Sequence, residues 1–503
     1  MKKSKKNNKK QNTPSFVLTL SLNTIISDTS ALNKYFELSR KIYNACLHEC
    51  LKRFNLMRQS KEYQKAKNMI SSSEKTKEFN RIEEKYGFKE YDIHKYVTKL
   101  RINEFKFIDT SICQKLATRA FNTVNKLRFG NAKKVNFISK NQLYSIEGKT
   151  NKQGIRFREI KGQYFICFNK LKIPVIIKKK DHYAKEALTH KIKYCRLKKL
   201  IIKGKEKYYI QLILEGLPPI KVDIETGEVK HYLGEDKIGI DIGTKTIAIC
   251  SENEVKLLEL AEGLTQNYKL KRILLRKMDR QRRANNPNKY NENGTIKKNN
   301  KTKWINSKNY LKTKSKHQDN SRKIATKREI LHNKLANEIL EIGNIIKVEM
   351  MNYKALQMRV KETKKDENGK FKNKKRFGKS LENKAPAKFL EILERKLKYQ
   401  QRELLKINTY KIKASQYNPF MDKYIKKDLN ERWNYFIINN EEIKIQRDLF
   451  SAFLIKNVIN DEYLDKIDRE KCLKEFDNFR KLHDIEVKRI KNSDNKILSS
   501  MGI

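Results

Sequence analysis

Three acidic residues lie where a carboxylate could take part in chemistry: Asp241, Glu349 and Asp448. Asp241 stands in the middle of residues 237–250, an apolar stretch that alternates β-branched with small residues and predicts a strand pair joined by a tight glycine turn. A carboxylate inside an apolar strand is strongly desolvated unless it is paired or binds a cation. Gly239 and Gly243 lie on either side of Asp241 and leave room for a phosphate or a metal ion to approach the backbone.

Two classes of protein use a strand of this kind. Sugar kinases and actin-like ATPases hold the phosphates of ATP in an Asp-x-Gly-Thr turn, and residues 241–244 read D-I-G-T. RNase H-like nucleases use the aspartate of their first strand to bind magnesium. An aspartate placed incidentally at a strand end is the third reading, and the stretch alone leaves all three open.

Glu349 and Asp448 help to decide among these three interpretations of Asp241. Glu349 falls in the short apolar strand I-I-K-V-E-M-M, and Asp448 begins a helix that reads Q-R-D-L-F-S-A-F-L. Each has an ordinary explanation, since Glu349 could pair with a lysine and Asp448 could cap its helix. A two-magnesium site, however, needs several carboxylate oxygens that converge from rigid elements, so that one ion activates water and the other stabilises the leaving 3′ oxygen. Three such acids in this order favour a phosphodiester-cutting nuclease.

The charge of the chain supports a nucleic-acid partner. The sequence has 115 Lys and Arg against 58 Asp and Glu, a formal net charge of +57 that is spread along its whole length. A surface this positive repels itself unless a polyanion neutralises it. A general lysine bias of the source is the alternative, but such a bias normally raises acidic residues as well. With 17 glycines in all and no second glycine-rich phosphate loop after Gly243, the ATPase reading is disfavoured.

The cysteines predict neither disulfides nor a metal site. There are seven, without a C-x-x-C pair, and an odd count without a framework indicates a reducing compartment. Cys46 and Cys50 share a helical face, and buried packing explains them better than a metal does, because no further ligands cluster with them. No apolar run of about 18 residues exists, so no membrane span is expected. We therefore expect no membrane partner.

The elements that must position the three acids predict a multidomain α+β protein. A basic disordered arm over 1–13 precedes an N-terminal β-barrel made of 14–27 and 135–235, and a helical domain over 28–134 is inserted into that barrel. An RNase H-like α/β domain then covers 236–413 and 445–460, with helices at 268–284, 311–341 and 386–405 and a strand at 406–413. An irregular insertion follows at 414–444, and a helical tail at 461–503. We expect 359–384 to be a mobile basic loop that contacts nucleic acid.

The sequence resembles the TnpB proteins of insertion sequences and their descendants, the type V CRISPR effectors. The resemblance rests on three segments, G-I-D-I-G-T-K-T-I-A-I at 239–249, V-E-M-M-N-Y-K-A-L at 348–356 and Q-R-D-L-F-S-A-F-L at 446–454. The last two are similar to the second and third RuvC motifs of that family. The N-terminal order of strand, helical insertion and barrel also agrees, so the likeness spans nearly the whole chain.

The resemblance implies a specific activity. Asp241, Glu349 and Asp448 become the RuvC triad that holds two Mg²⁺ ions, the barrel becomes a wedge domain and the helices become a recognition domain. The partners are then a guide RNA, either a transposon-end RNA or a CRISPR RNA, and double-stranded target DNA that is cut after RNA–DNA pairing beside a short flanking motif. The resemblance further implies a monomer, or a dimer on one RNA, in the cytoplasm of a prokaryote, associated with the nucleoid when it is bound to DNA.

One departure from the family concerns zinc. Many members carry a four-cysteine zinc knuckle before the third motif, whereas 414–447 contains no Cys and no His here. A zinc site of that kind is excluded by ligand chemistry, so no zinc is expected. The segment would instead be held by its aromatic residues, which are Tyr417, Trp433, Tyr435 and Phe436.

Two other functions fit the same residues. A guide-free RNase H-like enzyme, such as a transposase or a junction resolvase, would use the same carboxylates but has little need of a basic N-terminal half. A nuclease-dead, RNA-guided DNA binder would lack a triad acid, and all three are present.

Overall fold

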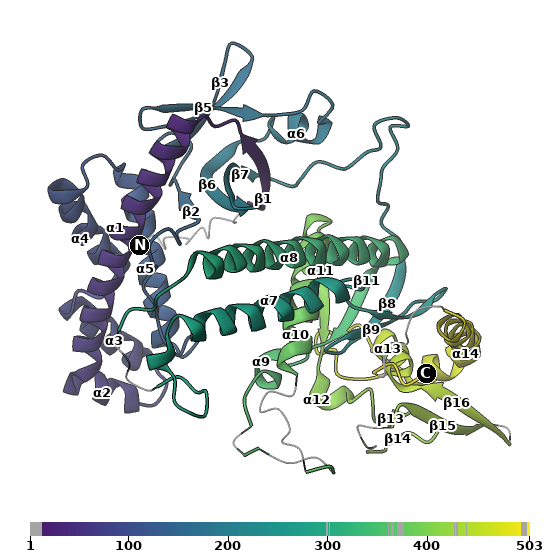
Figure 1. The fold of residues 1–503 in the computed structure, drawn as a ribbon. Helices are drawn as coiled ribbons and strands as arrows, with labels where there is room; N and C mark the ends of the chain where they lie inside the picture. The colour runs from purple at the N-terminus through teal and green to yellow at the C-terminus, as the bar shows by residue number, and fades with distance from the viewer. Residues whose placement is uncertain are drawn as a thin grey trace, which may run out of the picture. The chain divides into compact units, whose positions relative to one another are not determined.

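The computed structural model of this chain describes residues 13–297, 300, 302–360, 362–363, 367–369, 377–426, 428, 431–438, 440–493 and 500–503. The chain forms two compact units, Met1–Ile220 and Lys221–Ile503 (Figure 1). Apart from Thr13, the predicted basic arm lies outside the described residues. In the part of the chain that is described, no helix combines the length and the apolar character that crossing a membrane requires.

Helices fill the early part of the first unit. They are α1 (Ile26–Gln59), α2 (Lys61–Asn68), α3 (Ser73–Lys85), α4 (Glu90–Glu104) and α5 (Thr110–Arg128). Along α1, Leu32, Phe36, Tyr43 and Leu47 recur near helical spacing, and all are buried. These five helices occupy the helical domain that was predicted over 28–134. Cys46 and Cys50 are free and buried in α1, as their spacing predicted.

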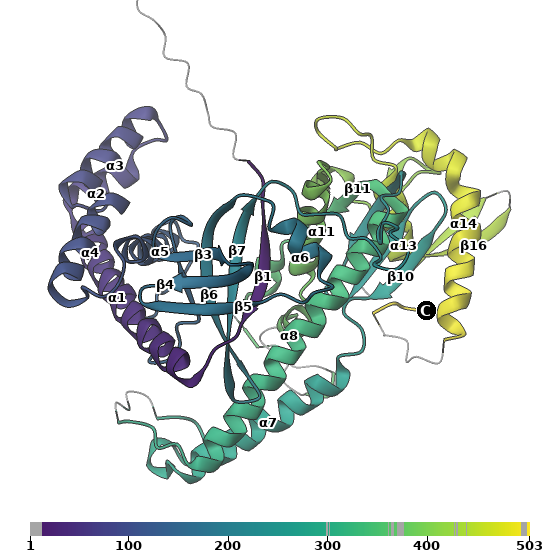
Figure 2. The same cartoon turned by 90° about the horizontal axis from the view of Figure 1, so that it is seen from above.

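The strands of the first unit form one seven-stranded sheet in the order β2-β6-β7-β1-β5-β4-β3 (Figure 2). Their bounds are β1 (Ser15–Leu22), β2 (Ser145–Glu147), β3 (Ile155–Ile160), β4 (Gln163–Phe168), β5 (Leu171–Ile176), β6 (Ile192–Ile202) and β7 (Lys205–Glu215), and the short helix α6 (His182–Ala187) follows β5. Strand β1 pairs with β7 and β5, so the chain enters this sheet, leaves for the helices and returns. The predicted closed barrel is wrong for the described residues, because β2 and β3 end the strand order and share no ladder, and β2 is only three residues long.

The sheet of the second unit has the order β10-β9-β8-β11-β12. Its strands are β8 (Asp236–Ile242), β9 (Thr246–Cys250), β10 (Val255–Glu259), β11 (Gly343–Glu349) and β12 (Leu404–Ile407). The first three are antiparallel neighbours, whereas β11 runs parallel to both β8 and β12. The predicted strand at 406–413 is corrected, because Asn408 caps a short helix, α12 (Thr409–Ile412), by accepting a hydrogen bond from the backbone N–H of Lys411.

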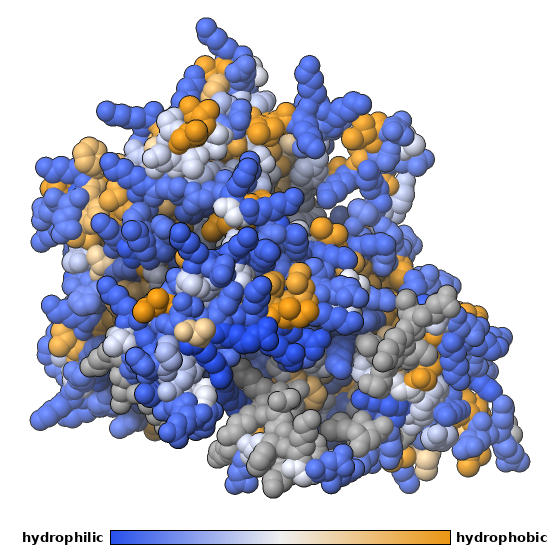
Figure 3. All heavy atoms as spheres, in the orientation of Figure 1, coloured by the Kyte–Doolittle hydropathy of each residue, from blue (hydrophilic) through white to orange (hydrophobic). Residues whose placement is uncertain are grey.

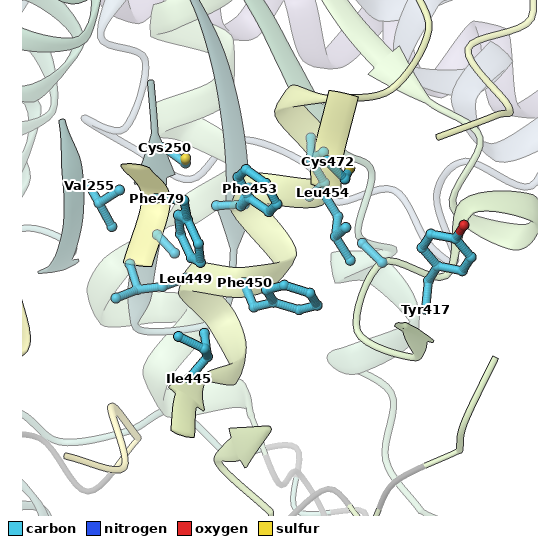
Figure 4. Packing of buried hydrophobic residues seen from close by; sticks show 14 of the residues in the cluster. Cys250, Val255, Tyr417, Ile445, Leu449, Phe450, Phe453, Leu454, Cys472 and Phe479 are labelled. Carbon is cyan, nitrogen blue, oxygen red and sulfur yellow. The ribbon is translucent and has the colours of Figure 1, made fainter. Parts of the chain in front are cut away.

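Helices cover both faces of this second sheet (Figure 1). Those on one side include α8 (Lys308–Ile342) and α11 (Pro386–Tyr399), whose side chains join Ile238, Ile240 and Ile242 of β8 in one buried cluster. On the other side lie α13 (Arg447–Lys456) and α14 (Arg469–Lys491), whose phenyl rings pack together as shown in Figure 4. The remaining helices are α7 (Thr265–Ala284), η1 (Pro287–Lys289), α9 (Tyr353–Leu356) and α10 (Gly378–Lys384), and α7 runs beside α8 (Figure 2).

Two predicted irregular segments contain regular structure. The insertion at 414–444 holds two hairpins, formed by β13 (Tyr417–Asn418) with β14 (Lys423–Tyr424) and by β15 (Trp433–Ile438) with β16 (Glu441–Gln446). Among its aromatic residues Tyr417 and Phe436 are buried, but Tyr435 is 56% exposed and does not hold the segment. The end of the predicted loop 359–384 is the helix α10, fixed by an ion pair of Lys384 with Glu259, while most of 361–376 lies outside the described residues.

Helix α13 lies directly against strand β8 at Gly239. A Cβ atom built there would collide with the carbonyl O of Ala452 and with the backbone N of Lys456. The room at Gly239 is therefore taken by a helix and not by a phosphate or a metal, which corrects the sequence interpretation. At Gly243 a Cβ would meet only Thr246, at 3.5 Å or more.

This contact makes a testable difference between the two glycines. We expect Gly239→Ala to lower the free energy of unfolding by about 2 kcal/mol or more, because backbone atoms cannot yield as a flexible side chain can. Gly243→Ala, four residues away, serves as the matched control and should stay within about 0.5 kcal/mol of wild type. Urea denaturation of both variants checks this, and equal stabilities would show that α13 does not need the glycine.

Candidate active site

Asp241 and Glu349 lie side by side on neighbouring parallel strands. The register pairs Val348 with Ile240, which places Glu349 next to Asp241 one residue further along. Both acids come near the ends of their strands, where β8 and β11 leave the sheet. Because side chains alternate along a strand, Asp241 points to the same face as Gly239, the face on which α13 packs. The register thus brings these two acids together at one edge of the sheet.

Asp448 reaches the same place from α13. The cap of this helix is Gln446, whose side-chain oxygen accepts a hydrogen bond from the backbone N–H of Leu449 at 2.8 Å. Asp448 is therefore not needed as a cap and stands in the first turn, where the helix dipole favours a negative charge. Its carboxylate is paired with Arg447 at 3.2 Å and lies 3.9 Å from a guanidinium nitrogen of Arg432.

The three acids line a single pocket of about 310 Å³. The rest of its wall comes from the turn after β8, from residues just past β11 and from the C-terminal part of the chain. These other lining residues are Gly243, Thr244, Lys245, Thr246, Ala248, Met351, Ser415, Gln416, Arg432, Arg447 and Ser500. Residues far apart in the sequence thus meet in one concave site, which is what the nuclease hypothesis required of Asp241, Glu349 and Asp448.

Burial and mutual repulsion set the electrostatics of the pocket. Burial raises the pKa of Asp241 well above its usual value, and the nearby charges of Asp448 and Glu349 raise it further, opposed by Arg447. Burial also raises the pKa of Glu349. Among the described residues, no side chain pairs with the carboxylate of Asp241 or of Glu349, so a lysine partner does not explain Glu349. Two carboxylates therefore stand in the pocket without an ion-pair partner, although the charge of Arg447 acts on Asp241 from a distance.

The donor chemistry of this pocket fits a hard divalent cation. Mg²⁺ prefers oxygen ligands, and the three acids supply only carboxylate oxygens. Across the described ranges, no three His, Cys, Asp or Glu side chains are drawn close enough to form a finished metal cage. The carboxylate of Asp448 contacts the guanidinium groups of Arg447 and Arg432, whereas Asp241 and Glu349 have no ion-pair partner among the described residues.

Sequence reasoning missed two neighbours of the acids. Tyr353 lies close enough to Asp241 and Glu349 that their charges, together with burial, raise the pKa of its phenol. Arg432 lies in the insertion that was predicted only to replace a zinc knuckle, and no motif marked it. Tyr353 falls inside the segment 348–356 and could have been found there. Asp461 and Asp465, two acids that follow the third motif in the sequence, do not line the pocket.

Comparison with known proteins gives distant likenesses only. No family model matches the chain, and no curated protein matches it. Among solved structures, a Cas12f1–sgRNA–target DNA complex is 14% identical over 86% of this chain and 83% of that chain, with a TM-score of 0.48. A CRISPR-Cas12f ternary complex is 13% identical over 86% of each chain, with a TM-score of 0.23. Because these identities and TM-scores are low, the interpretation of the pocket rests on the positions of its own residues.

Because the pKa of Asp241 is raised in the folded protein, ionisation of this carboxyl should lower the stability of the fold. A carboxyl whose pKa is raised by folding destabilises the protein once it ionises, so stability falls as the pH rises from about 4, the unfolded value, to the raised folded value. At neutral pH we expect Asp241→Asn to melt several degrees above wild type in the absence of divalent ions, with the difference shrinking toward about pH 4.

The exposed Asp477→Asn is the matched control and should leave the melting temperature unchanged. Adding Mg²⁺ should stabilise wild type but not Asp241→Asn. Calorimetry at two pH values, with and without the ion, measures both effects. An Asp241→Asn variant that melts below wild type at neutral pH would contradict the assignment of an uncompensated charge.

Proposed function

We propose that this chain is an RNA-guided DNA endonuclease. In this proposal it binds a guide RNA, recognises a short flanking DNA motif and cuts double-stranded target DNA in a single RuvC site. The observation that carries it is the meeting of Asp241, Glu349 and Asp448, from two strands and a helix, in one pocket. A helix cap and a surface ion pair, the ordinary explanations for two of these acids, do not account for that meeting.

The proposed chemistry is phosphodiester hydrolysis with two Mg²⁺ ions. Bound there, the ions would activate water and stabilise the leaving 3′ oxygen. Asp241 and Glu349 would hold them from adjacent strands, and Asp448 would complete the ligand set from the helix. Arg432, Arg447 and Lys245, which line the same pocket, supply positive charge to orient the phosphate that is attacked.

The arrangement of the second sheet supports this assignment. The order β10-β9-β8-β11-β12, with the first strand in the centre, three antiparallel strands and two parallel additions, agrees with an RNase H-like fold. The first acid is on the central strand and the second on its parallel neighbour. Fold likeness alone does not fix function, so the sheet supports the proposal only together with the pocket.

Nucleic-acid partners are supported by charge and by a polar groove. Hydrophilic residues cover most of the face seen in Figure 3. In the first unit a groove of about 430 Å³ between α5 and β2 is lined by Lys115, Arg119 and Lys126, with few acidic groups. In the second unit the helix α7 ends in R-K-M-D-R-Q-R-R-A. Such surfaces suit the phosphates of RNA and DNA, and the Cas12f1 structure likewise contains an sgRNA and target DNA.

The alternatives make different predictions about RNA. We expect the purified protein to carry a specific, hairpin-rich RNA that ends in a variable segment, and sequencing the bound RNA measures this. A guide-free nuclease would carry no such species, and full cleavage by RNA-free protein would overturn the guided reading. The sequenced RNA would also tell a transposon-end guide from a CRISPR RNA.

The role of the three acids is tested by measuring DNA cleavage and nucleic-acid binding in the same variants. We expect Asp241→Ala, Glu349→Ala and Asp448→Ala each to lower cleavage of a matched plasmid by about 10³-fold or more, because a site that has lost one ligand cannot hold both ions. Binding of RNA and target should persist, since backbone phosphates and base pairing carry it. Removal of divalent ions should abolish cleavage, and chelation of zinc should not.

Two controls sharpen this test. Arg447→Ala should weaken cleavage without erasing it, because Arg447 orients Asp448 and is not itself an ion ligand. Asp477→Ala removes an exposed acid outside the pocket and should cut normally. If Asp448→Ala cuts near the wild-type rate, the third acid has been misassigned; if all three variants do, the nuclease proposal is wrong.

Salt dependence tests the phosphate contacts. With a formal charge of +57, we expect RNA affinity to fall by about 10³-fold or more between roughly 50 and 200 mM salt, because bound counterions are released on association. Filter binding across that range gives the slope. A nearly flat slope would show that the charge takes no part in binding.

A further inference from the structure

A second cavity lies at the opposite end of α13 from the three acids. It encloses about 190 Å³ among the starts of β8 and β11, the end of α13 and the start of α14. Four lysines line it, one from each of these elements: Lys237, Lys347, Lys456 and Lys471. Ammonium groups that are gathered in one cavity repel one another unless anions balance their charge.

Lys347 is the most buried of these charges, with 3% of its surface exposed. Its Nζ donates hydrogen bonds to the carbonyl oxygen of Lys456, the last residue of α13, at 3.3 Å, and to that of Val458, two residues beyond the helix. The carbonyl of Lys456 belongs to the unsatisfied C-terminal end of the helix, so Lys347 stabilises that end. Among the described residues, no carboxylate pairs with it.

The counterions near the cavity do not balance its lysines. Glu475 is shared by Lys456, at 2.8 Å, and Lys471, at 3.5 Å. Asp468 lines the cavity but accepts a hydrogen bond from the backbone N–H of Lys471 as the cap of α14. Lys237, on the exposed side, has no ion-pair partner within the described ranges. The balance of the cavity is therefore positive.

A neutral hydrogen-bonding group completes the lining. Asn457 is 2% exposed. Its side-chain amide lies beside the carboxylate of Glu475 and the thiol of Cys472, but neither its nitrogen nor its oxygen makes a hydrogen bond of normal geometry in the described structure. Buried polar atoms without partners are rare in folded proteins and point to a ligand or an ordered water. An amide N–H beside ammonium groups is a donor set suited to an oxyanion.

We propose that this cavity binds a tetrahedral oxyanion of the phosphate class, held by Lys237, Lys347 and Asn457. Its size agrees with this ligand: 190 Å³ has room for about six waters, below the roughly 300 Å³ at which pockets for larger ligands begin. One phosphate group with a few waters fills it, whereas a whole nucleotide does not. The phosphate can come from a nucleic-acid backbone or from solution. This site is independent of the proposed nuclease activity.

Thermal melting with matched variants tests the site. In inorganic phosphate, compared with chloride at equal ionic strength, wild type should gain stability. Lys237→Gln should bind phosphate about tenfold more weakly, while Lys474→Gln, an exposed lysine on α14 outside the cavity, should bind as wild type does. Equal phosphate responses of these two variants would overturn the proposal.

Charge reversal gives a sharper form of the test. Lys237→Glu places a carboxylate where the anion would lie, so this variant should melt above wild type in chloride and should no longer respond to phosphate. Lys474→Glu should change neither property. A phosphate response that survives in Lys237→Glu would also overturn the proposal, and both variants alter exposed residues.

A last experiment distinguishes phosphate of a nucleic-acid backbone from free phosphate in solution. If a nucleic-acid backbone fills the cavity, protein saturated with a mixed-sequence RNA hairpin or DNA duplex loses its response to free phosphate. Lys237→Glu then weakens nucleic-acid binding more than Lys474→Glu does. If the anion comes from solution, the saturated protein keeps its phosphate response, and the two variants bind nucleic acid equally.

Discussion

The contact between α13 and β8 is the constraint on which the second unit depends. Every fourth residue of the helix faces the strand: Asp448, Ala452 and Lys456. The strand residues that they face, Asp241, Gly239 and Lys237, are two positions apart. Four helical residues rise about 6 Å and two strand residues about 6.7 Å, so the two elements stay in step over this length. Without a glycine in the middle, the helix would stand away from the sheet and the acids would separate.

The two ends of α13 carry opposite partial charges, and a side chain of the opposite charge lies at each end. The N-terminal end carries the positive part of the helix dipole and receives Asp448, an arrangement worth about 0.3–1 kcal/mol at exposed sites. At the C-terminal end Lys347 donates to the free carbonyl of Lys456. Between these ends Leu449–Lys456 is buried on every side, against the sheet, α14 and the hairpin of Phe436 (Figure 4). The helix therefore fixes the distance between an acidic pocket and a basic cavity.

Local sequence patterns predicted the elements that carry the acids, but not what surrounds them. The strand of Asp241, the strand end of Glu349 and the helix start of Asp448 follow from apolar periodicity, which is a local property. Closure of the N-terminal barrel depends on whether two edge strands pair, and the sequence does not contain that information; β2 is too short to continue the sheet. The role of Gly239 was misread for the same reason, because a glycine shows only that something lies close to it. Arg432 reaches Asp448 from a segment without a motif.

The arginines make the three acids unequal. Arg447 and Arg432 contact the carboxylate of Asp448, whereas Asp241 and Glu349 have no ion-pair partner among the described residues. The energetic cost of the site therefore falls on the two strand acids, whose pKa values are raised by burial. In the proposed nuclease, a divalent cation would be drawn first to these two carboxylates, because their charge is the least compensated. Asp448 would then be the ligand that Arg447 holds in position from the helix.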